Sequence, residues 1–330
     1  MSDLYPLKFE PVLKEKIWGG RALAEHYNKK AGMDRALGES WEISAVTGDI
    51  SVVTNGFLAG NSLEELIEVY MGDITGDSVY EKFGNEFPLL IKFIEAGQDL
   101  SVQVHPGNEI ARKKHNAYGK TEMWYILESK KGALIYTGFR EGVTKEMYQK
   151  AVEDGTIAEF LNAEEAEPGD VFFTPAGRVH AIGKGIVLVE IQQTSDITYR
   201  IFDWNRKGAQ KRELHTELAL EVIDFSQEGK NKVRIEPETN RISGMVSCEF
   251  FNTDILKFDT PLRREYYLRD SFVIYICTEG AFKLKWEGKE DRVIKGDTIL
   301  LPAMIKEVIL EPELSATILE VYIDEETKYI

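Results

Sequence analysis

Short runs of alternating or continuously apolar residues dominate the chain, and they predict strands far more often than helices. In a strand, side chains i and i+2 lie on the same face, so strict alternation indicates one packed face. Turn signals such as Asn55-Gly56 separate the runs. Strands are predicted at 39–44, 50–53, 88–95, 100–106, 123–127, 133–137, 171–173, 186–189, 272–277, 282–286, 298–301 and 316–322. So many short strands are typical of a mainly β protein of sandwich or barrel type.

Two segments interrupt this pattern and predict a small helical insertion each, at about 61–85 and 144–163. Apolar residues recur at helical spacing in the first segment: Leu63, Leu66, Ile67 and Tyr70. Asn61 is one candidate for its N-cap. Ser62 is the other, because Glu65 three residues later would complete a capping box.

Three further segments are expected to be irregular. Trp18-Gly19-Gly20 predicts a tight turn, 107–121 a loop or insertion, and the polar, charged stretch 225–241 a linker. This linker divides the chain into an expected catalytic, metal-binding domain, 1–225, and a smaller C-terminal domain, 240–330.

A degenerate internal repeat supports this division. Gly169-Asp170, four residues and Pro175 recur as Gly296-Asp297, four residues and Pro302, which indicates two copies of one β unit. The first copy continues to Gly177 and His180, and the spacing of Gly169, Pro175, Gly177 and His180 is that of the second signature of the cupin fold. The chain therefore resembles a bicupin, a pair of jelly-roll β-barrels or sandwiches.

The second copy departs from the first where a metal ligand would be needed. Glu307 stands eleven residues after Gly296, where the first copy has His180, and Met304 replaces Gly177. No Gln-x-His pair lies near 273–277. We therefore expect a degenerate second cupin domain that lacks metal ligands and has a structural role.

Four side chains form a candidate metal site in the first copy. Gln103 and His105 share one face of the strand that ends at Pro106, and Glu122 and His180 come from two other segments. Two nitrogen and two oxygen donors suit Zn²⁺, with iron or manganese as alternatives. The remaining histidines lie in polar contexts and are given no role: His26, His115 and His215.

Charge and composition restrict the class of protein and of partner. The 330 residues carry a net charge of −16, which argues against nucleic acid or an anionic membrane as the main partner but allows an anionic small substrate. Cys248 and Cys277 lie far apart in apolar surroundings and are expected to be reduced. The N-terminal residues show no signal peptide and no apolar run approaches a membrane span, so we expect a cytoplasmic protein. We expect it to be a monomer or a homodimer.

Longer motifs give a more specific resemblance. The stretches that carry it are Ser101–Pro106, Asn116–Trp124, Gly177–Ile182 and Glu190–Arg200. Together they resemble the type I mannose-6-phosphate isomerases, in the short bacterial branch that lacks large insertions. One departure is Thr121, where many relatives have proline. The resemblance implies reversible interconversion of mannose 6-phosphate and fructose 6-phosphate, an aldose–ketose isomerisation that proceeds through an enediol.

The resemblance also assigns residues, which we carry as expectations. It implies one Zn²⁺ per chain, bound by the four candidate ligands above, and catalytic roles for Arg200, Glu190 and Lys120. Candidate phosphate contacts fall on Ser101 and Lys92, with the basic segment 112–114 as a competitor. Trp18 is a candidate for the substrate pocket, although large aromatic residues are more often part of the core. An enediol mechanism needs a base near the carbons, for which Glu190 is a candidate, and a cation such as Arg200 beside the developing oxyanion.

Other functions remain open at this level. A related cupin isomerase could act on a different phosphosugar. A metal-dependent cupin oxygenase usually needs three histidines and a glutamate, or two histidines and a carboxylate, so Gln103 and the Lys120/Arg200 pair argue against it. A non-catalytic sugar-binding cupin would be expected to have lost a metal ligand or Arg200, and neither is lost.

Overall fold

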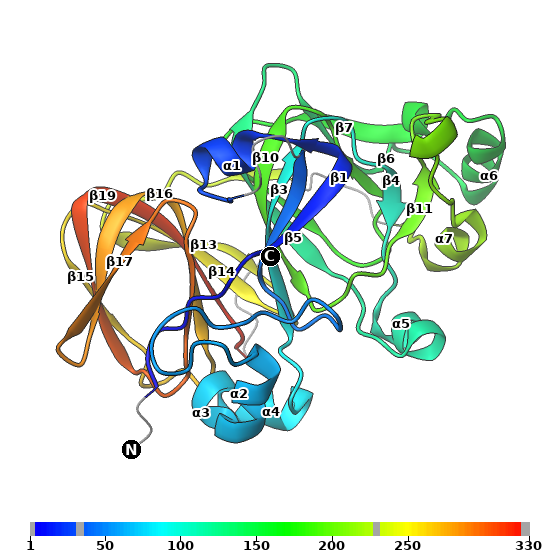
Figure 1. Cartoon of the computed structure of the whole chain (residues 1–330). Helices are drawn as coiled ribbons and strands as arrows, with labels where there is room; N and C mark the ends of the chain where they lie inside the picture. The colour runs from blue at the N-terminus through cyan, green and yellow to red at the C-terminus, as the bar shows by residue number, and fades with distance from the viewer. Residues whose placement is uncertain (1–3, 31–35, 227–231, 325–330) are drawn as a thin grey trace.

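Two β units lie side by side in the structure, a computed structural model that describes residues 4–30, 36–226 and 232–324. Strands β1–β12 form the unit on the right of Figure 1, and β13–β19, coloured yellow to red, form the unit on the left. Neighbouring strands of each sheet pair antiparallel. The prediction of a mainly β, cupin-type fold is confirmed.

The first unit is built from two sheets. The larger sheet has the order β1 (Val12–Gly20), β2 (Leu37–Ile43), β3 (Leu89–Ala96), β10 (Ile186–Gln193), β5 (Glu122–Ser129), β8 (Asp170–Thr174) and β12 (Lys232–Arg234). The smaller sheet has the order β11 (Tyr199–Phe202), β4 (Val102–Val104), β9 (His180–Ile182), β6 (Leu134–Phe139) and β7 (Leu161–Glu165). All of β3 and β10 is buried, which explains their continuously apolar sequences.

The second unit is a single sheet that curls on itself. Its main path is β13 (Arg241–Ser247), β14 (Asn252–Phe258), β19 (Glu307–Tyr322), β16 (Val273–Trp286) and β17 (Lys289–Ile294). Beside this path, β15 (Leu262–Glu265) pairs with β19 and β18 (Thr298–Leu301) pairs with β16. The long strands β16 and β19 pair with each other along most of their length and form the centre of the unit.

Short helices surround the first unit. They are α1 (Ala22–His26), α2 (Leu63–Tyr70), α3 (Gly72–Thr75), α4 (Asp77–Phe83), α5 (Asn108–His115), α6 (Lys145–Glu153) and α7 (Thr216–Val222), with 3-10 turns at Ile157–Phe160 and Gly208–Gln210. Both predicted helical segments contain helices, and β7 begins at the end of the second. Ser62 caps α2: its hydroxyl accepts from the Glu65 N–H at 3.2 Å, and Glu65 Oε2 accepts from the Ser62 N–H at 2.8 Å.

Several local predictions were wrong for identifiable reasons. Trp18-Gly19-Gly20 ends strand β1 rather than forming a turn, because Gly19 lets the backbone of β2 approach closely: a Cβ there would lie 2.5 Å from the Leu37 carbonyl carbon. Within 107–121 the chain forms α5, which the sequence hides because only Ala111 on it is buried. Residues 50–53 make isolated bridges and no strand.

The second half of the chain holds two more corrections. The strands predicted at 272–277 and 282–286 are one continuous strand, β16, which passes through Gly280 at a register shift. The predicted linker 225–241 contains β12, which pairs with β8, and its residues 227–231 lie outside the described part.

Among the described residues, the two units share one of three hydrophobic clusters, while the other two clusters lie within the first unit. A single cluster of buried side chains contains residues of both, from Leu4 to Val321. The N-terminal segment pairs with the second unit, where Leu7 and Leu300 exchange backbone hydrogen bonds of 2.8 and 3.0 Å. Lys29, also buried, donates to Glu42 at 2.7 Å and to the Gly296 carbonyl at 2.6 Å. The units are therefore packed together rather than merely tethered.

Strand registers show that the units repeat one design. In the first, Glu190 on β10 lies opposite Trp124 on β5, which lies opposite Phe172 on β8. In the second, Glu320 on β19 lies opposite Tyr275 on β16, which lies opposite Ile299 on β18. Phe172 and Ile299 each lie three residues after the repeated glycine, so registers and sequence repeat agree.

Candidate metal centre and its cavity

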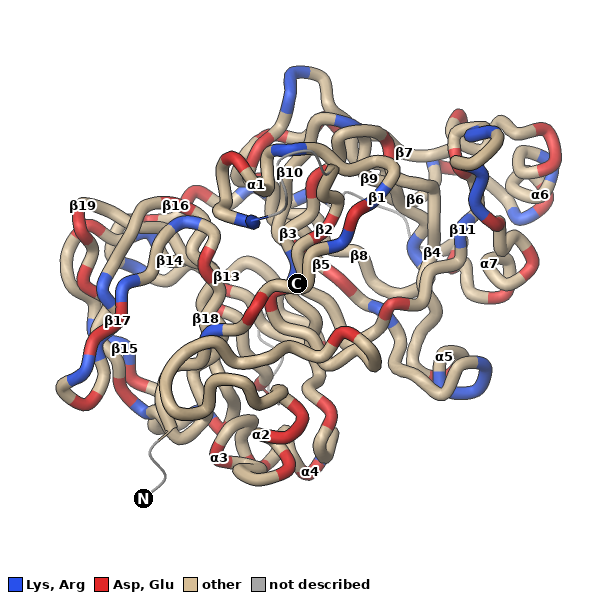
Figure 2. The backbone as a smooth tube through the Cα atoms, in the orientation of Figure 1, with Lys and Arg blue, Asp and Glu red and all other residues tan. Residues whose placement is uncertain are grey.

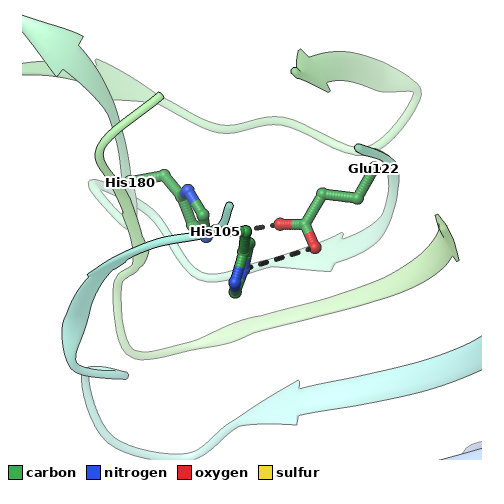
Figure 3. Close-up of side chains that lie close together, drawn as sticks. All are labelled: His105, Glu122 and His180. Atoms are coloured by element: carbon green, nitrogen blue, oxygen red, sulfur yellow. Dashed lines mark ion pairs between the residues drawn. The ribbon is translucent and has the colours of Figure 1, made fainter. Parts of the chain in front are cut away.

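Three predicted metal ligands converge inside the first unit. His105 follows β4, Glu122 begins β5 and His180 begins β9, so the two sheets supply ligands from opposite sides (Figure 3). Their potential ligand atoms all lie within 4.8 Å of one another. Glu122 Oε1 is 3.3 Å from His180 Nε2, and Glu122 Oε2 is 3.6 Å from His105 Nε2. All three side chains are buried.

The backbone fixes both imidazoles in the form that binds a metal. His105 Nδ1 lies 2.8 Å from the Ile197 carbonyl and His180 Nδ1 lies 2.9 Å from the Arg178 carbonyl, so each Nδ1–H donates. Each Nε2 then presents a lone pair to the Glu122 carboxylate. His180 Nε2 and Glu122 Oε1 have no hydrogen-bond partner among the described residues. A cation stabilises acceptors that face acceptors in a buried site, and among the described residues no hydrogen-bond donor binds these two atoms, so the residues fit a bound metal.

The protonation states agree with this reading. Burial lowers the pKa of His180 to about 3 and the pKa of His105 well below its usual range, with the Lys120 charge adding to both shifts. Both imidazoles are thus neutral at physiological pH, as a metal ligand must be. Burial also raises the pKa of Glu122, an effect that Lys120 partly offsets. A bound cation would favour the ionised carboxylate.

Gln103, the fourth predicted ligand, is half-buried on β4. It lies directly opposite His180 on β9 and Arg200 on β11, and directly opposed residues share a face of the sheet. Its side chain lines the same cavity as Arg200. Gln103 therefore stands on the face of the sheet that carries the metal-site histidine and the predicted catalytic arginine.

Lys120 connects the ligand cluster to the cavity. Its Nζ lies 2.9 Å from Glu122 Oε2 and 3.2 Å from His105 Nε2, and the same side chain lines the cavity wall. Burial opposes its charge, but the neighbouring Glu122 and Glu190 outweigh burial and raise the pKa of Lys120. Lys120 is therefore a permanent cation beside the metal ligands.

The cavity has a volume of about 290 Å³ and an excess of positive charge. Its charged lining residues are Lys14, Lys16, Lys92, Lys120, Arg200, Arg212, Glu39, Asp49, Glu190 and Asp196. Six cations thus face four carboxylates, although the whole chain carries −16. The site therefore suits a small anionic ligand.

Glu190 and Lys92 form a buried pair in the cavity wall. Lys92 Nζ donates to Glu190 Oε1 at 2.9 Å and to Gln192 Oε1 at 2.7 Å, while Trp124 Nε1 donates to Glu190 Oε2 at 3.0 Å. Burial opposes the charge on Glu190, but Lys92 and Lys120 outweigh it and lower its pKa to about 2. Glu190 is therefore ionised at all physiological pH values, and both of its oxygens are occupied.

Arginines gather at another part of the cavity. Arg200 Nε donates to Ser101 Oγ at 3.3 Å and its Nη1 donates to the Glu213 carbonyl at 2.8 Å. Asp203, which is buried, binds Arg206 and Arg212. One carboxylate thus holds two guanidinium groups next to a third, and this local excess of positive charge favours an anion at the Ser101 end of the cavity.

Comparison with known proteins gives one consistent family. The model of the type I phosphomannose isomerase catalytic domain matches residues 6–143. A mannose-6-phosphate isomerase from Bacillus subtilis is 38% identical over 314 residues, which cover 93% of this chain and 96% of the relative. One from Streptococcus mutans is 33% identical, over 91% of this chain and 93% of the relative.

The chain belongs to the type I mannose-6-phosphate isomerase family. Its structure agrees: the crystal structure of the mannose 6-phosphate isomerase from Bacillus subtilis superimposes with a TM-score of 0.84 at 30% identity, over 97% of this chain and all of that one. A phosphomannose isomerase from Salmonella typhimurium shares the fold, with a TM-score of 0.75 at 18% identity.

Seven residues to which the sequence assigned catalytic, substrate-binding or metal-binding roles line the cavity: Trp18, Lys92, Ser101, Gln103, Lys120, Glu190 and Arg200. The segment Arg112–Lys114, which competed as a phosphate site, lies on α5 and does not line the cavity. It forms part of the blue patch on α5 in Figure 2. Trp41 also belongs to the wall.

Several lining residues of this isomerase family member were missed from the sequence. They are Lys14, Lys16, Glu39, Asp49, Asp196, Thr198 and Arg212. Lys14 and Lys16 alternate with Trp18 along β1, a period-two signal that could have been read had Trp18–Gly20 not been taken as a turn. Arg212 comes from a segment without periodicity, and only the fold places it. No helix within the described residues is long and apolar enough to cross a membrane.

Proposed function

We propose that this protein interconverts mannose 6-phosphate and fructose 6-phosphate with the aid of one bound Zn²⁺. One observation carries the proposal: a cluster of two histidines and one glutamate lies beside a cavity in which cations outnumber carboxylates, and Lys120 contacts both. The relatives named for this reaction, which match the chain over more than nine-tenths of its length, support the same substrate.

Zinc would be held by Gln103, His105, Glu122 and His180. This set provides two imidazole nitrogens and two oxygens, a donor set that zinc accepts in four-coordinate sites, with iron or manganese as alternatives. When bound, the metal would act as a Lewis acid toward sugar oxygens.

The phosphate is assigned to the arginine end of the cavity. Arg200 and Arg212 line it, and Ser101 offers a hydroxyl beside the Arg200 guanidinium. A dianion there would compensate the excess positive charge around Asp203. Lys92 is the other candidate phosphate contact, but its ammonium already donates hydrogen bonds to Glu190 and Gln192. A phosphate beside it would be repelled by the Glu190 carboxylate. We therefore assign Lys92 to holding Glu190.

Three charged groups have separate roles in the proton transfer: Lys120 donates a hydrogen bond, Glu190 positions the lysines, and Asp196 is the candidate base. Lys120, as a buried ammonium next to the metal ligands, would donate to the sugar oxygen on which negative charge develops. Glu190 would hold Lys92 and Lys120 in place, because a carboxylate with a pKa of about 2 is a weak base. Asp196 is the remaining candidate base: of the four lining carboxylates it alone has no ion pair within the described residues.

Arg200 and Trp18 complete the assignment. Arg200 would fix the substrate and stabilise the enediolate oxygen, and Trp18 would form a flat wall for the sugar ring. A cupin oxygenase is disfavoured because the cavity lining is rich in charge rather than apolar. An isomerase for another phosphosugar uses the same groups, so the substrate must be measured.

The test is a panel of phosphosugars offered to the metal-loaded protein. Conversion of mannose 6-phosphate should exceed that of glucose 6-phosphate, ribose 5-phosphate and unphosphorylated mannose, as read from the appearance of the corresponding ketose. A clear preference for another phosphosugar would reassign the substrate and keep the reaction. Absence of conversion for every sugar would refute the proposed activity.

A further inference from the structure

The second unit carries a large hollow for which the isomerase reaction has no use. It has a volume of about 740 Å³ and lies at the β16–β17 hairpin, next to β15 and the start of β19, on the left of Figure 1. Tyr267 and the two stretches 285–290 and 304–309 line it. None of these residues belongs to the first unit. This size is in the range of about 300–1,000 Å³ that small-molecule sites occupy.

The hollow is built from the counterparts of the segments that carry the metal histidines. Glu307 lies eleven residues after Gly296, as His180 lies eleven after Gly169. Glu307 pairs with Glu265 across β15 and β19, as His180 pairs with Gln103 across β4 and β9. Two residues beyond these partners stand Tyr267 and His105 respectively. Both counterparts, Glu307 and Tyr267, line the hollow. In the second unit, the segments that correspond to the metal-bearing segments of the first unit therefore line a hollow. Glu307 and Tyr267 stand there in place of the two histidines.

Charges around the hollow are matched to one another. Three lysines and three glutamates line it: Lys285, Lys289, Lys306, Glu287, Glu290 and Glu307. Arg263 binds Glu307 at 2.5 Å, Lys283 binds Glu290 at 2.9 Å, and Lys306 donates to the Arg269 carbonyl at 3.0 Å. Such a lining offers many hydrogen-bond donors and acceptors but no net charge, so it favours a neutral polar ligand over a phosphate.

Two aromatic residues give the hollow its apolar surface. Tyr267 is 63% exposed, so its ring is available to a ligand. Trp286 is 8% exposed and forms part of the wall, and its indole N–H has no hydrogen-bond partner within the described residues. Because the chain itself covers this N–H, Trp286 contributes to the wall and its signal reports on the hollow, whereas Tyr267 offers the exposed ring.

We propose that this hollow binds a neutral hexose, at a site separate from the catalytic cavity. A hexose ring supplies the required features: hydroxyl groups that both donate and accept, no charge, and an apolar ring face for Tyr267 and Trp286. The proposal does not depend on the isomerase activity, because none of the lining residues belongs to the catalytic cavity.

The experiment follows the tryptophan indole N–H signals of the full-length, zinc-loaded, ¹⁵N-labelled protein by NMR. The chain has five tryptophans, and the signal missing from Trp286→Phe identifies Trp286. D-mannose is titrated and D-glucose follows, with glycerol as a control for unspecific solute effects. We expect the Trp286 signal to shift saturably with a hexose at millimolar concentration and to stay fixed with glycerol.

A matched pair of surface variants keeps the test informative if Trp286→Phe folds poorly. Tyr267→Ala should raise the midpoint concentration by about 3- to 10-fold, the loss of one aromatic contact. Leu268→Ala, at a neighbouring exposed residue outside the lining, should leave the midpoint unchanged. A Trp286 signal that never moves, that moves equally with glycerol, or that moves only with a phosphosugar would overturn the proposal. Isomerase turnover measured on the same samples tests the proposed function separately.

Discussion

At the scale of single residues, the hydrogen bonds made by the Nδ1 atoms of His105 and His180 orient the metal site. Each Nδ1–H donates to a backbone carbonyl, so each Nε2 is left as an acceptor beside Glu122. The sequence could suggest this ligand set because His105 directly follows a strand and His180 begins one, each within a motif of recognisable spacing. It could not show that Ile197 and Arg178 supply the carbonyls, since those contacts depend on the fold.

Arginine and histidine variants should separate catalysis from metal binding. Arg200→Ala should lower kcat/KM by about 10²–10³-fold, the usual effect of removing one preorganised donor, while bound zinc is unchanged. His180→Ala should lose zinc and activity together, because it removes a ligand atom. Zinc content by atomic absorption and turnover by a coupled assay measure both effects. Arg241→Ala and His26→Ala, at exposed positions outside the cavity, are the matched controls. Full activity of Arg200→Ala would show that its assignment is wrong.

The assignment of the base can be tested with two carboxamides. Asp196→Asn should reduce kcat by about 10²–10⁴-fold with little change in KM, because it removes a proton acceptor and leaves the charged walls in place. Glu190→Gln should chiefly raise KM and disturb the fold around Lys92, because it leaves a buried ammonium without its counter-ion. Steady-state kinetics with circular dichroism as a folding check distinguishes the two. The reverse pattern would make Glu190 the base.

At the scale of elements, the repeated registers place a charged residue at the same point of both units. Glu320 corresponds to Glu190, and it binds Arg264 at 2.8 Å and Arg269 at 3.0 Å instead of a lysine. Asp254 lies directly opposite Glu320 on β14, as Lys92 lies opposite Glu190 on β3. The second unit therefore retains a buried ionic centre, with a carboxylate where the first unit has a cation.

This centre predicts a pH-dependent stability. Burial, with the Glu320 charge as the second cause, raises the pKa of Asp254 to about 6, so the folded state holds its proton more tightly than the unfolded state does. Stability should then fall as pH rises from about 4 to 6 and stay lowered above pH 6. Asp254→Asn should stabilise the protein by about 2–3 kcal/mol at pH 7.5 and have little effect at pH 4. Urea unfolding at both values measures this.

The control for that measurement is Asp259→Asn, which changes an exposed carboxylate nearby. It should shift stability by less than about 0.5 kcal/mol at either pH. Equal stabilities of Asp254→Asn and the parent protein at pH 7.5 would mean that Asp254 is not destabilised by ionisation in the folded state.

Strands and helices that bury an apolar face could be predicted from the sequence. Elements whose conformation depends on contacts with other parts of the chain could not. Buried β3 and β10 are visible as apolar runs, and the capping box locates α2. Helix α5 was missed because a polar helix with one buried residue has no apolar stripe. The end of β1 was missed because its glycines serve the approach of β2, which the sequence does not show.

At the scale of the whole molecule, the units depend on each other. Leu7 pairs with Leu300, and the backbone of Met304 donates to the Asp73 carbonyl at 3.0 Å. The division into a catalytic domain, 1–225, and a degenerate C-terminal domain, 240–330, stays a prediction, and the core that both units share argues that they do not fold separately.

A truncated chain tests this dependence. Residues 1–225 alone should lose the cooperative unfolding transition, because truncation exposes the apolar surface that the first unit buries against the second. The full chain should unfold in one transition, followed by circular dichroism and tryptophan fluorescence. A cooperative, zinc-binding 1–225 fragment would instead establish an independent catalytic domain.

The sequence could predict the charge of the molecule but not the reversal of charge in its cavity. Figure 2 shows acidic residues along many elements of both units, whereas the cavity gathers cations from segments that are far apart in the chain. Lys14 and Arg212 are almost two hundred residues apart and meet only in the fold.

Removal and return of the metal decide whether the protein interconverts mannose 6-phosphate and fructose 6-phosphate in a metal-dependent reaction. Turnover of mannose 6-phosphate is followed in a coupled assay before chelation, after chelation, and after zinc, iron or manganese is added back. We expect turnover to be lost with the metal and to return with zinc. Undiminished turnover in protein shown to be metal-free would contradict this expectation.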